Sequence, residues 1–379
     1  MTAPDRFAAE HWFLARGLPS MLRRGALLRQ VWSRSAPALA AFAVIALNSI
    51  VIVVVTGQHT VDIPGRPDAA EGFVLALVVL VLPVAALAGW LVSRLKTPLR
   101  EAMAGNAALA AIVVGMIFGG PSYRIGVNLV VAAITIALIL LATATGIGSI
   151  LGFMFYITRT NLALMSGMFV RALPVVLLTF LVFFNGPVWQ LTAVLSRQRL
   201  WAGMLFLFLI AAAFLVSTTL DRVRPILAES QPALEGDETL DGTPFAGLPD
   251  RAGGKPLSRG ERVNVVFVVA SSQVSQVLTV ALLTGAIFVV LGMIVVSPEV
   301  LDSWTRGAGR PDGRLLGMTL PIPDALIQTS MLLAAITFMY LSAKTVSDTA
   351  YRAQFIEPLM DDLRRTLVAR NRYRAAVPR

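Results

Sequence analysis

The chain has 379 residues, of which 56% are hydrophobic and 14% are charged, and its mean hydropathy is +0.74. A soluble fold cannot bury so much apolar surface, so this composition excludes the ordinary soluble classes and predicts an integral membrane protein. The net charge of +10 comes from basic residues that flank apolar runs. This pattern sets membrane topology and differs from the basic stripe of a nucleic-acid-binding domain, so no nucleic-acid partner is expected.

The residue types of common catalytic and metal sites are scarce. The chain has no cysteine and two histidines, His11 and His59, which argues against disulfides, thiolate nucleophiles and most transition-metal sites. A Ser/His/Asp arrangement would need one of these histidines, and the topology derived below puts them on opposite sides of the membrane. The acidic residues of the outer loops lack a spacing diagnostic of paired-carboxylate catalysis. We therefore expect no enzyme activity and no cofactor.

The first 36 residues are basic and amphipathic. They contain six arginines and apolar residues that include Phe7, Trp12 and Trp32. No small-residue cleavage site follows a short apolar core, so we expect this segment to be retained and not removed as a signal peptide. The pattern predicts one or two helices, which either lie on the inner leaflet or dock as solvated helices.

Eight apolar stretches are long enough to cross a bilayer, which takes roughly 20 residues. None of them contains Asp, Glu, Lys, Arg or His, so all ionisable side chains can stay outside the hydrocarbon core. The sequence therefore predicts an all-α, polytopic transmembrane bundle. The eight stretches cover residues 37–56, 72–92, 102–118, 127–157, 172–190, 201–219, 263–297 and 325–343.

The loops predict the orientation of these spans. Alternating them across the membrane assigns 25 basic residues to one side and 7 to the other. The basic side is cytoplasmic by the positive-inside rule. Both termini are thus expected in the cytoplasm, with the chain in the plasma membrane.

Two of the stretches are too long for a simple crossing. Residues 127–157 and 263–297 would each exceed about 45 Å as straight helices. The first can break near Thr143 to Thr145. For the second we favour an interfacial portion up to Gln276, where several Ser and Gln residues interrupt the apolar pattern, with the crossing beginning near Val277.

The remaining segments are hydrophilic. Residues 221–262 contain five prolines, six glycines and mixed charge, a composition that predicts a disordered cytoplasmic linker. The outer loop 298–324 can fold back onto the membrane surface, and the tail predicts an amphipathic helix with Pro358 in its first turn. The expected organisation is 1–36 N-terminal segment, 37–220 spans one to six, 221–262 linker, 263–343 spans seven and eight, and 344–379 tail.

Small residues recur four apart in two spans. Such stripes let helix backbones approach closely in lipid, so we predict helix packing there, either within the chain or at a dimer seam or substrate groove. The third span carries Ala107, Ala111, Gly115 and Gly119, and the fourth carries Ala144, Gly148 and Gly152.

Polar side chains within spans are the other candidate sites. Asn48 is a lone amide in the first span, Ser272, Gln273 and Gln276 lie in the seventh, and Gln328 lies in the eighth with neighbouring Thr and Ser. They are candidates for interhelical hydrogen bonds or for ligand contacts. The seventh and eighth spans enter from opposite sides, so we expect their polar clusters at different membrane levels.

No ionisable side chain lies within a span, which argues against a proton-coupled pump. We therefore favour a non-enzymatic membrane component that assembles with another membrane protein or with copies of itself. The alternative is a permease or channel for a small molecule or a lipid-like substrate, which could bind through broken helices. An intramembrane enzyme acting on lipid is the third possibility. The bilayer is the one partner that every alternative shares.

The last third of the chain resembles multi-spanning membrane proteins of actinobacteria that have no known function. The residues that carry this resemblance are Ser258-Arg259-Gly260-Glu261-Arg262, Ser297-Pro298-Glu299, Trp304 and Tyr351-Arg352-Ala353-Gln354-Phe355. The resemblance implies an actinobacterial plasma membrane and brings no catalytic motif, substrate or partner.

Overall fold

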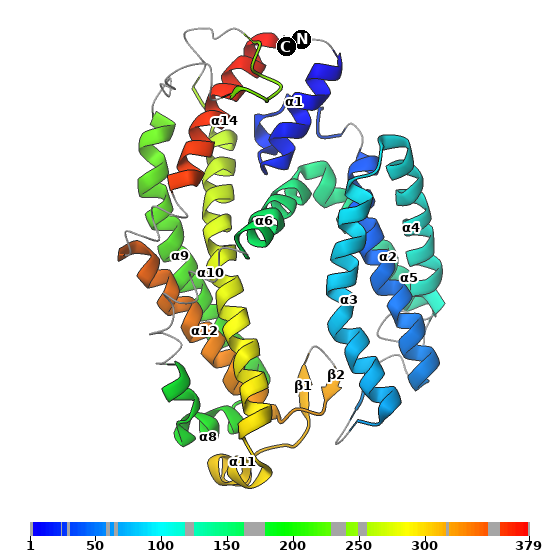
Figure 1. Cartoon of the computed structure of the whole chain (residues 1–379), viewed down its shortest axis with the longest axis vertical. Helices are drawn as coiled ribbons and strands as arrows, with labels where there is room; N and C mark the ends of the chain where they lie inside the picture. Colours follow the sequence, from blue (N-terminus) through cyan, green and yellow to red (C-terminus); the bar gives the residue numbers. More distant parts are fainter. Residues whose placement is uncertain are drawn as a thin grey trace. The chain divides into compact units, whose positions relative to one another are not determined.

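The structure is a computed structural model, shown in Figure 1. It describes residues 3–23, 25–28, 31–57, 61–63, 67–117, 125–162, 179–228, 240–248, 256–315, 318–347 and 357–377. The described chain is almost entirely helical, which confirms the predicted all-α membrane bundle. It forms two compact units. Unit 1 comprises Met1–Ala26, Ser149–Gly309 and Ala325–Arg379, and unit 2 comprises Leu27–Gly148 and Arg310–Asp324.

Unit 2 is built on four helices with a small hairpin. The helices are α2 (Val31–Thr56), α3 (Ala69–Ser93), α4 (Thr97–Ile117) and α5 (Ile125–Thr145), and the strands are β1 (Gly313–Leu315) and β2 (Met318–Leu320). Helix α2 packs against α3, α4 and α5. The core between α2 and α4 is mostly alanine, because small side chains let the two backbones come close without a bulky residue between them. Its alanines are Ala36, Ala40, Ala43, Ala46, Ala104, Ala107, Ala108 and Ala111.

The outer loop contributes the hairpin of unit 2. Strands β1 and β2 pair antiparallel, and Thr319 exchanges backbone hydrogen bonds with Val61 and Ile63. Met318 packs with these two residues and with Val74 of α3. The sequence predicted only that this loop can fold back, and the structure shows it pairing with the segment between α2 and α3.

Unit 1 contains the N- and C-terminal helices and the longest apolar helices. Its helices are α1 (Ala3–Ala15), the 3-10 turn η1 (Pro19–Met21), α6 (Ile147–Leu162), α8 (Gly186–Val194), α9 (Arg197–Ala228), α10 (Arg259–Val295), α11 (Pro298–Thr305), α12 (Asp324–Ser347) and α14 (Glu357–Ala376). Helices α9, α10 and α12 run beside one another in Figure 1 and share a core. Ala211, Val277, Val280, Ala281, Phe338 and Leu341 form that core.

Six described helices are long and apolar enough to cross a membrane. They are Val31–Thr56, Ala69–Ser93, Ile125–Thr145, Arg197–Leu227, Arg259–Val295 and Asp324–Lys344. The predicted third span lies in α4, which is not among the six. Of the predicted fifth span, residues 172–178 lie outside the described residues, and its described end leads into the nine-residue helix α8. Eight spans therefore stay a prediction.

The two long stretches behave differently. The first breaks where a break was expected, because Gly146 has a φ of 84° and separates α5 from α6. Only glycine adopts this left-handed conformation without strain. The second is one continuous helix, α10, of 37 residues. It has no break near Val277, and the interfacial position of its first portion stays a prediction.

The predicted linker is partly folded. Helix α9 continues to Ala228, and residues 240–248 form turns in which Leu240 and Phe245 are buried. Residues 229–239 and 249–255 lie outside the described residues. The boundary expected at residue 221 was wrong in one respect, since the apolar helix passes through it without a break.

Candidate functional site

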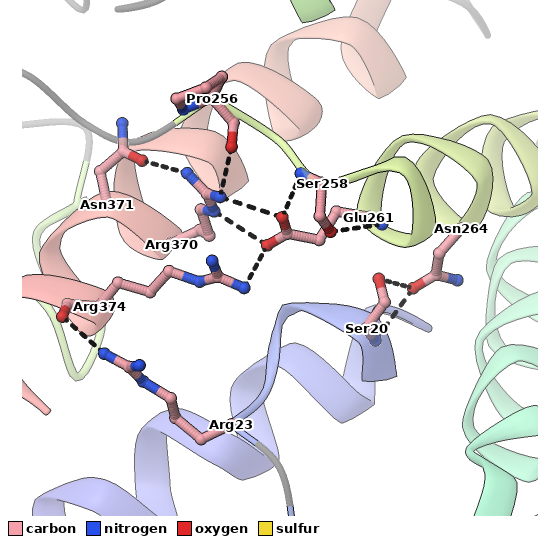
Figure 2. Close-up of polar contacts among 9 residues, drawn as sticks. All are labelled: Ser20, Arg23, Pro256, Ser258, Glu261, Asn264, Arg370, Asn371 and Arg374. Atoms are coloured by element: carbon pink, nitrogen blue, oxygen red, sulfur yellow. Dashed lines mark hydrogen bonds and ion pairs between the residues drawn. The ribbon is translucent and has the colours of Figure 1, made fainter. Parts of the chain in front are cut away.

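Segments from four parts of unit 1 converge on the first turn of α10. We call this set the terminal module and define it as residues 3–23, 240–248, 256–264 and 357–377. Figure 2 shows its central polar contacts, which join α14, the start of α10 and the segment around η1. The module brings together the hydrogen-bonded charged side chains of Arg23, Glu261, Arg370 and Arg374, so it is the candidate site.

Glu261 lies at the centre of the terminal module. It is the third residue of α10, and its carboxylate accepts a hydrogen bond from the backbone N–H of Ser258 at 2.8 Å while its own N–H donates to Ser258 Oγ at 3.3 Å. This reciprocal capping box fixes the helix start and the direction of the carboxylate. Glu261 is only 1% exposed, so its charge needs a partner within the protein.

Two arginines of α14 supply that partner. Arg370 donates from Nε to Glu261 Oε1 and from Nη2 to Oε2, both at 3.0 Å. Arg374 Nη2 lies 2.7 Å from Oε1. The side chain of Arg370 is 3% exposed, and this two-pronged geometry is the strong form of an Arg–carboxylate pair. The pair joins residues 109 positions apart.

Further bonds attach the N-terminal segment to the same place. Asn264 Oδ1 accepts from Ser20 Oγ at 2.7 Å and from the Ser20 N–H at 3.2 Å. Arg23 donates to the backbone carbonyls of Arg374 and Val377 at 3.1 and 2.6 Å. The N-terminal segment is thus bonded to both α10 and α14 (Figure 2).

An aromatic cluster completes the terminal module. The rings of Trp12, Phe13, Phe245 and Tyr373 pack at centroid distances of 5.1–5.5 Å. Burial, followed by the neighbouring charge of Glu10, raises the pKa of Tyr373. Its hydroxyl therefore stays protonated and donates to Glu10 Oε1 at 3.4 Å. The terminal helices α1 and α14 thus contact each other through Phe13 and Tyr373, and whether they also lie on the inner leaflet stays a prediction.

The chemistry of this arrangement is that of a structural clamp. Both oxygens of Glu261 are occupied by hydrogen bonds, which hold α14 on the start of α10. Removing one partner of such a buried charge pair lowers the stability of the folded protein by several kcal/mol, because the other charge remains buried and unpaired. Across the described residues, no group of three or more His, Cys, Asp or Glu side chains could hold a metal ion.

The polar residues predicted within spans do not join this cluster. Ser272, Gln273 and Gln276 are buried in α10. Ser272 donates to the Val268 carbonyl of its own helix, and Gln273 accepts from Thr219 of α9 at 3.1 Å. Ser272 thus bonds within its own helix and Gln273 bonds between two helices.

Gln328 and Asn48 lie elsewhere. Gln328 is 3% exposed in α12. Its neighbours in α12 contact the part of α10 between Gly285 and Gly292. A Cβ on Gly285 would lie 3.4 Å from the Ser330 carbonyl oxygen, and a Cβ on Gly292 would meet the side chain of Leu326. The two polar clusters therefore sit at different levels along α10, as predicted. Asn48 is half-buried in α2, and no hydrogen bond joins it to another described residue.

The predicted packing residues divide into two groups. Ala111 is fully buried between α2 and α4, and a Cβ on Gly115 would lie 3.5 Å from Ala132 of α5. Gly119 lies outside the described residues. The second stripe is interrupted, because the left-handed Gly146 puts Gly148 on a different helix from Ala144, and a Cβ on Gly152 would meet nothing within 4 Å.

An apolar groove lies beside the terminal module within unit 1. It has a volume of about 570 Å³ and is formed by α6, α9 and α10. Its lining is aliphatic apart from Phe267, Ser271 and two arginines, Arg224 and Arg262. Arg262 directly follows Glu261, so neighbouring residues of one helix face the groove and the clamp.

Sequence reasoning missed Glu261, Arg370 and Arg374 as a unit. The spacing from Ser258 to Glu261, ahead of an apolar run, signals a helix start, but it does not reveal a partner in the tail. Comparison with protein-family models, with curated proteins and with solved structures found no match to this chain.

Proposed function

We propose that this chain is a non-enzymatic component of the bacterial plasma membrane that assembles with another membrane protein or with copies of itself. The terminal module would be its cytoplasmic docking face. The observation that carries the proposal is the Glu261–Arg370–Arg374 clamp, which fixes the C-terminal helix α14 on the start of α10. Ser20 and Arg23 attach the N-terminal segment to the same two elements, so both ends of the chain share one defined surface. A preformed surface binds a partner without the entropic cost of ordering loose tails.

Charge supports the orientation and the location. The module contains arginines from the N-terminal segment, the linker end and the tail, which the positive-inside rule assigns to the cytoplasm. The resemblance to actinobacterial membrane proteins agrees with a plasma membrane and leaves the partner open.

A permease for a lipid-like substrate is the second candidate, and the apolar groove favours it. The groove follows α10 from Arg262 to Val274, which is about 18 Å at 1.5 Å per residue. A transport route must cross a hydrocarbon core of about 30 Å. The groove alone therefore supports binding better than passage.

Mass spectrometry of the tagged full-length chain tests the assembly role. The protein is purified gently from its native membrane at native expression, and co-purifying proteins are quantified. We expect a stoichiometric partner or a defined homo-oligomer with wild type, loss of it with Glu261→Gln, and retention with Glu71→Gln, which alters a matched but exposed capping box in unit 2. Purification as a lone monomer would contradict the proposal, and flux assays in liposomes would then test the permease.

A further inference from the structure

We propose that the groove formed by α6, α9 and α10 binds one anionic phospholipid, with its phosphate on Arg224 and Arg262 and an acyl chain along the apolar floor. The inference does not depend on the assembly role, because it rests on the groove alone. The groove volume of about 570 Å³ falls within the range of roughly 300–1,000 Å³ typical of ligand sites.

Helical spacing explains why two charges and an apolar surface share one groove. On α9 the lining residues Val216, Leu220, Arg224 and Leu227 are three or four positions apart and so lie on one face. On α10, Arg262 begins a similar series that continues through Val266, Ala270 and Val274. Both arginines stand near one end of their series, so the groove is basic toward one end and apolar along the rest.

This polarity matches a phospholipid of one leaflet. From Arg262 to Val274 the groove is about 18 Å long, close to half of a 30 Å hydrocarbon core, which is about 15 Å. A headgroup at the arginines would therefore leave its acyl chain within the same leaflet. By the positive-inside rule this is the cytoplasmic leaflet.

Both arginines are available to an added phosphate. Arg262 is exposed, and no acidic residue in the described part of the chain forms an ion pair with it. Its neighbour Glu261 is already held by Arg370 and Arg374. Among the described residues, Arg224 forms an ion pair with Asp221, at 3.9 Å, and both side chains are more than 70% exposed. Such surface pairs contribute little, so a phosphate can displace Asp221.

Native mass spectrometry of the delipidated full-length protein tests the proposal. The protein in mild detergent is titrated with phosphatidylglycerol or with phosphatidylcholine of the same acyl chains. We expect wild type to bind one phosphatidylglycerol roughly tenfold more tightly than phosphatidylcholine. The Arg224→Gln/Arg262→Gln variant should lose that preference, since each basic residue near an anionic headgroup contributes on the order of a fivefold change in affinity.

Two controls separate the groove from general surface charge. Arg222→Gln/Arg259→Gln removes the same charge from the same two helices at positions that do not line the groove, and it should keep the preference. Ser271→Phe places a ring in the groove and should weaken binding of both lipids. Thermal unfolding of each variant identifies any that fail to fold.

Three outcomes would overturn the proposal. Equal loss in the two double variants would mean that the lipid responds only to net charge. Equal binding of both lipids by wild type would mean that the two arginines do not recognise the anionic headgroup. Unchanged binding in a folded Ser271→Phe protein would place the lipid outside the groove.

Discussion

Unit 1 and unit 2 hold their helices together by different chemistry. Unit 2 relies on small side chains, and its core between α2 and α4 is largely alanine. Unit 1 adds aromatic rings, such as Phe183 and Trp189, and the buried clamp of the terminal module. Within lipid, apolar side chains gain little from leaving their surroundings, so close backbone approach drives association. In unit 1, charges and hydrogen bonds join α14 to the first turn of α10, which precedes the apolar part of that helix.

Glu261→Gln should have the largest effect on stability of the variants that test this contrast. Gln at this position can keep the capping box but leaves the buried Arg370 without its counter-charge. We expect a loss of about 3–5 kcal/mol in the free energy of unfolding, measured by denaturant unfolding in mild detergent. Glu71→Gln, in the exposed capping box of α3, should change stability by less than about 1 kcal/mol. Equal effects would mean that the clamp does not stabilise unit 1.

A double-mutant cycle sharpens this result. Glu261→Gln, Arg370→Met and the double variant should give a coupling energy of about 2–3 kcal/mol, because removing both charges leaves neither unpaired. The exposed pair of Asp361 and Arg364, at 3.3 Å, serves as the control and should couple by less than about 0.5 kcal/mol. Additive single effects at the buried pair would contradict a direct interaction.

The stability of unit 2 should be most sensitive to added side-chain volume between its helices. A Cβ on Gly89 of α3 would lie 2.9 Å from the Pro37 carbonyl oxygen of α2, and backbone atoms cannot rotate away. Gly89→Ala should therefore cost about 1–3 kcal/mol of stability, as overpacking does. Gly72→Ala in the same helix meets nothing within 4 Å and should be neutral or stabilising by up to about 1 kcal/mol. Unfolding of both variants by circular dichroism checks the difference.

The smallest predicted effect concerns a neutral hydrogen bond in unit 1. Thr192 Oγ1 of α8 lies 2.8 Å from Thr329 Oγ1 of α12, and both residues are buried. A cycle of Thr192→Val and Thr329→Val should give a coupling of about 0.6 kcal/mol, the average for hydrogen bonds between membrane helices. A coupling as large as that of Glu261 and Arg370 would erase the distinction between neutral and charged contacts.

Features set by short stretches of sequence were predicted well. Apolar run length identified the membrane class and the long helices, because a bilayer fixes how many consecutive apolar residues a crossing needs. The break between α5 and α6 followed from an overlong stretch. The stripe through Ala111 and Gly115 was placed in helix packing, because small residues four apart share one face.

Predictions that depended on a distant partner fared worse. The linker composition gave no sign that Phe245 would be buried against Trp12 and Phe13. The polar residues from Ser271 to Gln276 suggested an interfacial segment, and their pattern did not reveal that Ser272, Gln273 and Gln276 are buried in a continuous α10. Polar side chains interrupt an apolar pattern in the same way whether they meet headgroups or the neighbouring helix.

By itself, the sequence determined that this is a helical membrane protein and where its longest apolar helices run, because those properties follow from local composition and spacing. Tertiary structure alone decided that Glu261 pairs with Arg370 and Arg374, and that the two terminal helices face each other. An amphipathic helix has the same sequence pattern whether its apolar face covers lipid or protein. The sequence likewise does not reveal whether an arginine in the tail is exposed or buried. Only the folded chain brings residues more than 100 positions apart to hydrogen-bonding distance.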